Sequence, residues 1–140
     1  MKKSLIIVSG YFNPLHSGHL EYFKLAKKLG DNLLVIVNND TQRELKGSKE
    51  FMLQKERITI VKELRIVDKV YLSVDTDRSV SKTIKKVFND HHKNYNIFFA
   101  NGGDQKNEMI PEAKICSELG IELIDKLGKK IQSSSWLLNK

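Results

Sequence analysis

The chain is organised around the stretch Gly10-Tyr11-Phe12-Asn13-Pro14-Leu15-His16-Ser17-Gly18-His19. It follows a short apolar run, 5–8, and precedes a segment whose apolar residues recur with helical spacing, at Leu20, Phe23, Ala26 and Leu29. This pattern predicts a strand, a tight turn and a helix. A first helical turn that carries two histidines would gather imidazoles and free backbone N–H groups around one point, which suits an anion.

The rest of the chain alternates short runs rich in Val and Ile with longer segments of helical period. Further strands are expected at 33–37, 67–73, 96–100 and 121–124, and helices at about 53–64, 80–91 and 111–119, with a last helix starting at 133. The lysine-bearing segment 41–50 is polar and is expected to be a flexible connection. This alternation predicts a parallel sheet covered on both faces by helices.

Three polar segments follow predicted strands: 10–19, 40–50 and 101–104. In open parallel sheets, ligands bind outside the carboxyl ends of the strands. We therefore expect these segments to meet at one edge and to form the functional site.

Length and composition indicate one domain, residues 1–140, because 140 residues with 40% hydrophobic content can bury a core without disulfides or metals. The one cysteine, Cys116, fits a reducing compartment and lies in the apolar stripe of an expected helix, so we expect it to be buried. The first apolar run is too short for a signal peptide or a membrane span, and a cytoplasmic protein is expected.

The net charge of +7 arises from 24 Lys and Arg against 17 Asp and Glu. Such an excess favours anionic partners, but it does not by itself choose among nucleotides, phosphorylated metabolites, nucleic acid and membrane surfaces.

His16 and His19 lie three positions apart, so they would share a face of the first helical turn. Gly18 between them would let a phosphate chain approach the backbone. One alternative is that one histidine caps the helix and the other packs. Another alternative is a zinc site, which needs a third ligand. The other two histidines, at 91–92, and the one cysteine, Cys116, do not lie at the ends of expected strands, so they do not supply that ligand. The combination of Gly, Pro and two His in one turn favours the phosphate site.

The stretch 10–19 resembles the signature of the nucleotidyltransferase superfamily, Gly-x-Phe-Asp/Asn-x-x-His-x-Gly-His, which contains the HxGH motif. It is most similar to the small glycerol-3-phosphate cytidylyltransferases and the heptose-1-phosphate adenylyltransferases. Blocks resembling the rest of this family follow in the same order, at 28–40, 45–47, 56–57, 65–68, 102–104 and 133–135. The resemblance implies an α/β, Rossmann-like three-layer sandwich with a five-stranded parallel sheet.

The same resemblance implies that a nucleoside monophosphate is transferred from CTP to a small phosphorylated metabolite, with release of pyrophosphate. His16, His19 and Lys46 are the implied catalytic residues, with Lys46 closing over the triphosphate. Nucleotide contacts are implied for Tyr11, Phe12, Asn13, Gly18, Arg57, Gly102, Gly103, Asp104, Gln132, Ser133 and Ser134. Mg²⁺ would accompany the triphosphate without a metal site of the protein's own. No nucleic-acid or membrane partner is expected, and a homodimer is the family expectation.

Two features leave the substrates open. Small cytidylyltransferases carry Arg-Thr-x-Gly before their last Ser/Thr block, where this chain has 127–132, and Lys129 or Lys130 would supply charge without the two-pronged geometry of arginine. The stand-alone length favours CTP, whereas the run from Asn39-Asp40 to 45–47 resembles the adenylyltransferases and makes ATP on a sugar phosphate the alternative.

A non-catalytic nucleotide- or RNA-binding module is the alternative from another class. It would bind without turnover and would carry its lysines as a stripe away from the histidines. Asp40, Arg57, Arg65 and Asp68 also match family positions, and an ion network that holds the fold together explains them as well as ligand contact does.

Overall fold

The computed structural model describes residues 2–47, 49, 51–101 and 110–124. Its strands form one sheet in the order β3-β2-β1-β4-β5, and all neighbouring strands are parallel. The strands are β1 (Lys3–Gly10), β2 (Asn32–Val37), β3 (Lys69–Leu72), β4 (Tyr95–Ala100) and β5 (Glu122–Ile124). The five-stranded parallel sheet predicted from the sequence is confirmed.

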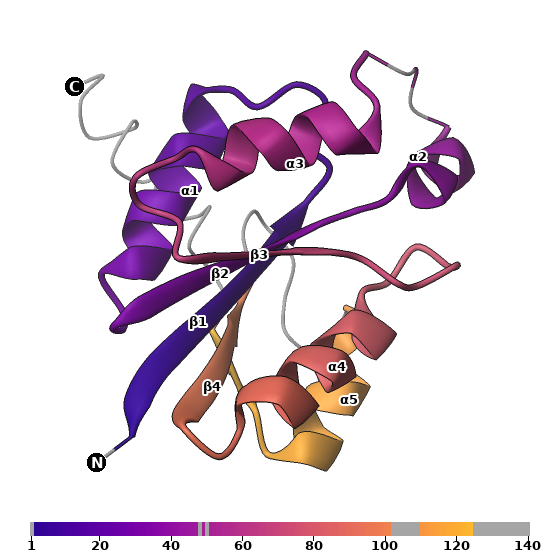
Figure 1. Cartoon of the computed structure of the whole chain (residues 1–140). Coiled ribbons are helices and arrows are strands. Elements are labelled where there is room, and N and C mark those ends of the chain that lie inside the picture. Colours follow the sequence, from indigo (N-terminus) through magenta and orange to yellow (C-terminus); the bar gives the residue numbers. More distant parts are fainter. Residues whose placement is uncertain (1, 48, 50, 102–109, 125–140) are drawn as a thin grey trace, which may run out of the picture.

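Helices cover both faces of this sheet, as Figure 1 shows. The helices α1 (Ser17–Lys27) and α3 (Gln54–Lys62) lie on one face, and α4 (Ser81–His91) and α5 (Glu112–Leu119) lie on the other. A further short helix, α2 (Asp40–Lys46), follows β2 beyond the carboxyl edge of the sheet. The molecule is therefore the three-layer α/β sandwich that the resemblance implied.

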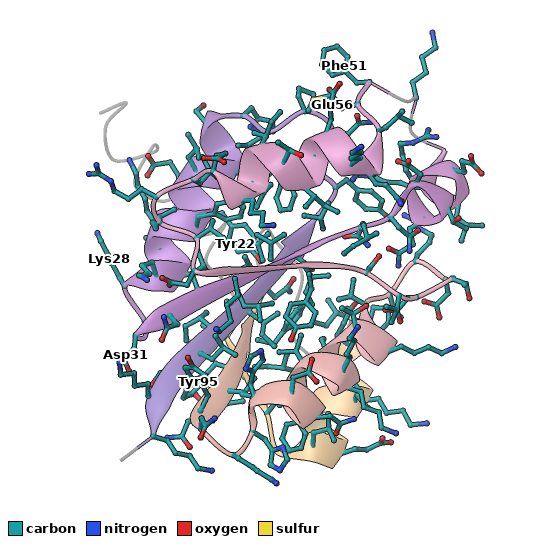
Figure 2. The ribbon with its side chains drawn as sticks, viewed as in Figure 1. Tyr22, Lys28, Asp31, Phe51, Glu56 and Tyr95 are labelled. Atoms are coloured by element: carbon teal, nitrogen blue, oxygen red, sulfur yellow. The ribbon has the colours of Figure 1, made fainter. Side chains whose placement is uncertain are left out.

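The central strand β1 is buried on both faces because its apolar run is continuous. Leu5 and Ile7 belong to the core cluster shared with α4 and α5, whereas Ile6 and Val8 belong to the cluster shared with α1 and α3. On the α1 side, the hydroxyl of Tyr22 donates a hydrogen bond to the carbonyl oxygen of Ala100 at 2.6 Å (Figure 2). This bond ties α1 to the end of β4 and helps to fix the turn before α1.

The segment 41–50 differs most from the sequence prediction, because its first part is helical. Asn39 caps α2: its side-chain oxygen accepts a hydrogen bond from the Gln42 backbone N–H at 2.9 Å, and the Gln42 side chain accepts one from the Asn39 N–H at 3.1 Å. Gly47, with a φ of 81°, ends the helix. This reciprocal cap carries no apolar periodicity, so hydrophobic spacing did not reveal the helix.

Other elements differ in detail. Leu29 lies beyond the end of α1 and is 41% exposed, so it does not extend the apolar stripe of that helix. On α3, Ile60 is 40% exposed, whereas Arg57 and Val61 are buried. Cys116 is buried as predicted. The helix expected at 133 lies outside the described residues.

Within the part of the chain that the structure describes, no helix combines the length and the apolar character that a bilayer crossing requires.

Candidate active site

A pocket of about 380 Å³ opens where β1 ends and α1 begins. Its lining consists of Ser9, Gly10, Tyr11, Phe12, Asn13, Pro14, His16, His19 and Lys46. The three residues predicted to be catalytic thus meet in one pocket, together with three of those predicted to contact the nucleotide. None of the described residues in this lining is a carboxylate. The pocket is therefore suited to an anion.

Both histidines use their Nδ1 atom to organise the start of α1. His16 is the N-cap, and its Nδ1 accepts a hydrogen bond from the Gly18 N–H at 3.1 Å. His19 Nδ1 accepts one from the His16 N–H, also at 3.1 Å. An Nδ1 that accepts a hydrogen bond carries no proton, so the neutral ring carries its proton on Nε2. Each ring thus combines the capping role with an Nε2–H donor for a ligand.

The pKa of His19 is lowered to about 4 by burial of the ring and, to a smaller extent, by the nearby charges of His16 and Lys46. The two imidazole centroids lie 3.9 Å apart. Near neutral pH, His19 is therefore uncharged and supplies a hydrogen bond rather than a full charge.

The ring of Phe12 packs against the ring of His19 on the core side of the pocket. Phe12 is 2% exposed, has a φ of 54°, and packs edge to face against His19 and Phe23 at centroid distances of 4.9 and 5.4 Å. A Cβ on Gly10 would come within 2.8 Å of the Phe12 ring. Glycine at position 10 is therefore what allows this ring to lie under the site.

Gly18 has a similar steric role beside His16. A Cβ at position 18 would lie 2.9 Å from Cε1 and 3.1 Å from Nδ1 of the His16 ring. Gly18 is not part of the pocket lining, so its predicted contact with the nucleotide would be through the exposed backbone at the start of α1.

Lys46 reaches the pocket from the last turn of α2. Its Nζ lies 4.4 Å from the centroid of the Tyr11 ring, a cation–π contact that holds the ammonium group near the pocket. The lysine is thus carried by a helix, rather than by the flexible segment expected from the sequence.

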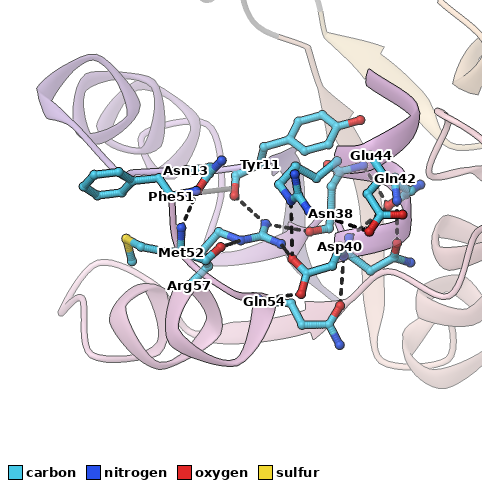
Figure 3. Close-up of polar contacts among 12 residues, drawn as sticks. Tyr11, Asn13, Asn38, Asp40, Gln42, Glu44, Phe51, Met52, Gln54 and Arg57 are labelled. Atoms are coloured by element: carbon cyan, nitrogen blue, oxygen red, sulfur yellow. Dashed lines mark hydrogen bonds and ion pairs between the residues drawn. The ribbon is translucent and has the colours of Figure 1, made fainter. Parts of the chain in front are cut away.

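Arg57 was predicted to contact the nucleotide, but its side chain is 0% exposed. Its guanidinium donates to the carbonyl oxygens of Tyr11 (2.7 Å), Asn38 (2.7 Å) and Met52 (3.1 Å), and it pairs with the Asp40 carboxylate at 2.7 Å (Figure 3). One buried cation therefore joins the turn after β1, the end of β2 and the starts of α2 and α3. The geometry gives Arg57 a positioning role, as in the network alternative.

Asn13 links the same turn to the segment before α3. Its side-chain oxygen accepts hydrogen bonds from the N–H groups of Phe51 (3.1 Å) and Met52 (2.7 Å), and its Nδ2 donates to the Lys49 carbonyl at 2.8 Å. The Phe51 ring points outward and is 70% exposed (Figure 2). The Asn13 amide thus holds one wall of the pocket in place.

The remaining predicted site residues, Gly102, Gly103, Asp104, Gln132, Ser133 and Ser134, lie outside the described residues, as do Lys129 and Lys130.

Sequence reasoning missed Gln54. Its backbone N–H donates a hydrogen bond to the Asp40 carboxylate at 3.1 Å, and its side-chain oxygen accepts one from the Asp40 N–H at 2.9 Å. The described residues contain no group of three or more His, Cys, Asp or Glu side chains that could hold a metal.

The chain is similar to several known proteins over most of its length. A family model described as cytidylyltransferase-like matches residues 7–128. Two proteins named FAD synthase, from Thermoplasma volcanium and Picrophilus torridus, are each 32% identical to this chain, over 96% and 93% of its length and 92% and 90% of their own. A crystal structure described as a lipopolysaccharide core biosynthesis protein from Thermoplasma volcanium superposes with a TM-score of 0.68 at 25% identity, over 88% of this chain and 95% of that one.

Proposed function

This chain belongs to the cytidylyltransferase-like family of nucleotidyltransferases, and we propose that it transfers the adenylyl group of ATP to the phosphate of flavin mononucleotide. FAD consists of AMP and flavin mononucleotide joined through their phosphates, so a FAD synthase that works by nucleotidyl transfer needs these two substrates. The similarity to FAD synthases over at least 90% of both chains favours this pair.

The observation that carries nucleotidyl transfer is the pocket itself, where two imidazoles and a lysine converge and none of the described lining residues is a carboxylate. In the reaction, an oxygen of the phosphomonoester attacks the α-phosphorus of the triphosphate. The bond from the α-phosphorus to the bridging oxygen breaks, and pyrophosphate leaves with the electron pair. The acceptor phosphate is already largely a dianion near pH 7, because its second pKa is about 6, so the site needs no strong general base.

What this reaction requires from the protein is alignment of two anions and stabilisation of the charge that develops on the phosphates. The Nε2–H groups of His16 and His19 are donors to phosphate oxygens, and the start of α1 adds its positive dipole end. Lys46 supplies the full positive charge. Arg57 and Asn13 hold the loops that carry these groups.

Mg²⁺ would enter with the triphosphate, bound by phosphate oxygens and water. The described lining of the pocket includes imidazoles, an ammonium group and neutral side-chain oxygens but no carboxylate, whereas proteins usually hold Mg²⁺ through carboxylates. We therefore assign no residue of the described chain as its ligand. The homodimer expected from the resemblance stays a prediction, which sedimentation velocity would test.

CTP is the competing donor, because the family model is described as cytidylyltransferase-like and the chain length favoured it. The test measures pyrophosphate release with ATP or CTP, each paired with flavin mononucleotide, glycerol 3-phosphate or a sugar 1-phosphate. We expect turnover with ATP and flavin mononucleotide that His19→Ala lowers by about 100-fold or more, as for loss of one transition-state donor. Turnover with CTP alone would refute the adenylyl assignment. Absence of turnover with every pair would refute nucleotidyl transfer to these acceptors.

A further inference from the structure

A second cation, Arg78, lies near Tyr11. The side chain of Arg78, in the connection between β3 and α4, lies close enough to the Tyr11 hydroxyl for its charge and its N–H groups to act on the phenol. The pKa of Tyr11 is raised because burial of the phenol outweighs the opposite effects of the Arg78 charge and N–H groups. Tyr11 therefore has Lys46 over its ring and Arg78 near its hydroxyl.

The loop that carries Arg78 is anchored on both sides of this residue. The Nε2 of Gln42 donates to the carbonyl oxygens of Asp77 and Ser79, each at 2.7 Å, and Gln42 is 0% exposed. The Asp77 carboxylate in turn accepts hydrogen bonds from the backbone N–H and the hydroxyl of Ser79, at 3.0 and 2.8 Å. The backbone at Arg78 is thus fixed before any ligand arrives, although the arginine is exposed.

One helix organises both cations. Gln42 and Lys46 belong to α2, so the helix that brings Lys46 over Tyr11 also holds the Arg78 loop. The Gln42 side-chain oxygen is fixed by hydrogen bonds from the Asn38 side chain at 3.0 Å and the Asn39 N–H at 3.1 Å. The buried Gln42 amide is fully hydrogen-bonded, and its partners join the end of β2 and the start of α2 to the β3–α4 loop. A loop that only displayed an arginine to solvent would not require such an anchor.

Neither Lys46 nor Arg78 forms an ion pair with a residue of the described chain. The Asp77 carboxylate next to Arg78 is engaged by Ser79. An exposed arginine without an acidic partner is ordinary on a surface. Here it lies near Tyr11, which lines a pocket whose described lining residues include no carboxylate. The planar guanidinium of an arginine can bind two phosphate oxygens at once.

We propose that Arg78 is a further substrate-binding residue. Its side chain moves away from the Tyr11 hydroxyl and binds a phosphate group of one of the substrates. This deepens the proposed function and rests on it. The shared chemistry is a phosphate dianion, which belongs to the triphosphate or to the phosphomonoester acceptor. Tyr11 contacts both cations, Lys46 and Arg78, and so holds them on the same side of the bound anion.

The test compares Arg78→Ala and Arg78→Lys with a control, Lys85→Ala, which removes an exposed cation from α4. The KM for ATP is measured at saturating flavin mononucleotide, and the KM for flavin mononucleotide at saturating ATP. We expect Arg78→Ala to raise one KM by about tenfold or more, as for loss of a charged hydrogen bond, and Arg78→Lys to raise it less. The KM that rises identifies which phosphate Arg78 binds. Values within twofold of the control for both substrates would overturn the proposal.

Tyr11→Phe separates direct contact from an effect through Tyr11, because it keeps the ring and removes the hydroxyl. If it reproduces the whole loss seen in Arg78→Ala, Arg78 acts through Tyr11, and the proposed phosphate contact is wrong. A loss clearly smaller than that of Arg78→Ala supports the contact.

Direct binding keeps the proposal testable if no substrate pair turns over. Calorimetry with inorganic tripolyphosphate and with inorganic phosphate represents the triphosphate and the acceptor. Binding to the wild type that weakens about tenfold in Arg78→Ala but not in Lys85→Ala supports Arg78 even where the proposed function fails. Equal affinities in both variants, or no binding to the wild type, would overturn the role of Arg78.

Discussion

Replacement of Arg57 by methionine should destabilise this protein strongly, although Arg57 is a polar residue. Methionine fills much of the same volume but removes a guanidinium that pairs with Asp40 and donates to the carbonyl oxygens of Tyr11, Asn38 and Met52. Breaking a buried ion pair by removal of one partner costs about 3–5 kcal/mol. The Asp40 side chain is 26% exposed and regains some hydration, so the lower end applies, about 3 kcal/mol.

For a domain of this size, about 1 kcal/mol corresponds to about 4 °C in Tm, so Arg57→Met should lower Tm by about 12 °C. Differential scanning calorimetry of the whole chain measures this. Arg65→Met is the matched control, because Arg65 is exposed, and it should change Tm by about 2 °C or less. Arg57→Lys should fall between the two, because an ammonium group keeps the charge but does not reproduce the planar, multidentate hydrogen-bond geometry. A Tm of Arg57→Met within about 4 °C of the wild type would refute a structural role for the buried guanidinium.

Three further predictions concern the pocket and the core. Gly18→Ala places a Cβ 2.9 Å from the His16 ring, so nucleotidyl transfer should fall by about tenfold or more while circular dichroism shows an unchanged fold; full activity would contradict the packing described. The pKa of His19 is about 4 when folded and about 6.5 when unfolded. The unfolded chain therefore binds this proton first, and the free energy of unfolding, measured with urea, should decrease as the pH falls from about 6.5 to about 4. His19→Gln should show a flatter dependence, and equal slopes would count against the shift. Burial and, secondarily, Glu112 raise the pKa of Cys116 to about 12, so iodoacetamide at pH 8 should label the thiol only after denaturation, as mass spectrometry would show.

Much of the fold follows from patterns that are local in the sequence. The apolar run 5–8 predicted a strand, and the structure divides its residues between the two core clusters. Gly120, with a φ of 73°, ends α5 at the end predicted for the helix 111–119. Hydrophobic spacing failed at α2, because that helix depends on the polar cap of Asn39 and Gln42 rather than on an apolar stripe.

For the candidate site, the sequence by itself determined the part of the pocket lining that comes from the continuous stretch 10–19. His16 and His19 had to meet because they lie three positions apart at a helix start. Only the tertiary structure decided that Arg57 is buried and that Arg78 reaches Tyr11. The partners of Arg57 lie 46, 19, 17 and 5 positions away, and those of Gln42 on the Arg78 loop lie 35 and 37 positions away. Hydrophobic periodicity records which face of an element is buried, but a polar side chain takes its role from whichever backbone groups the folded chain brings within about 3 Å.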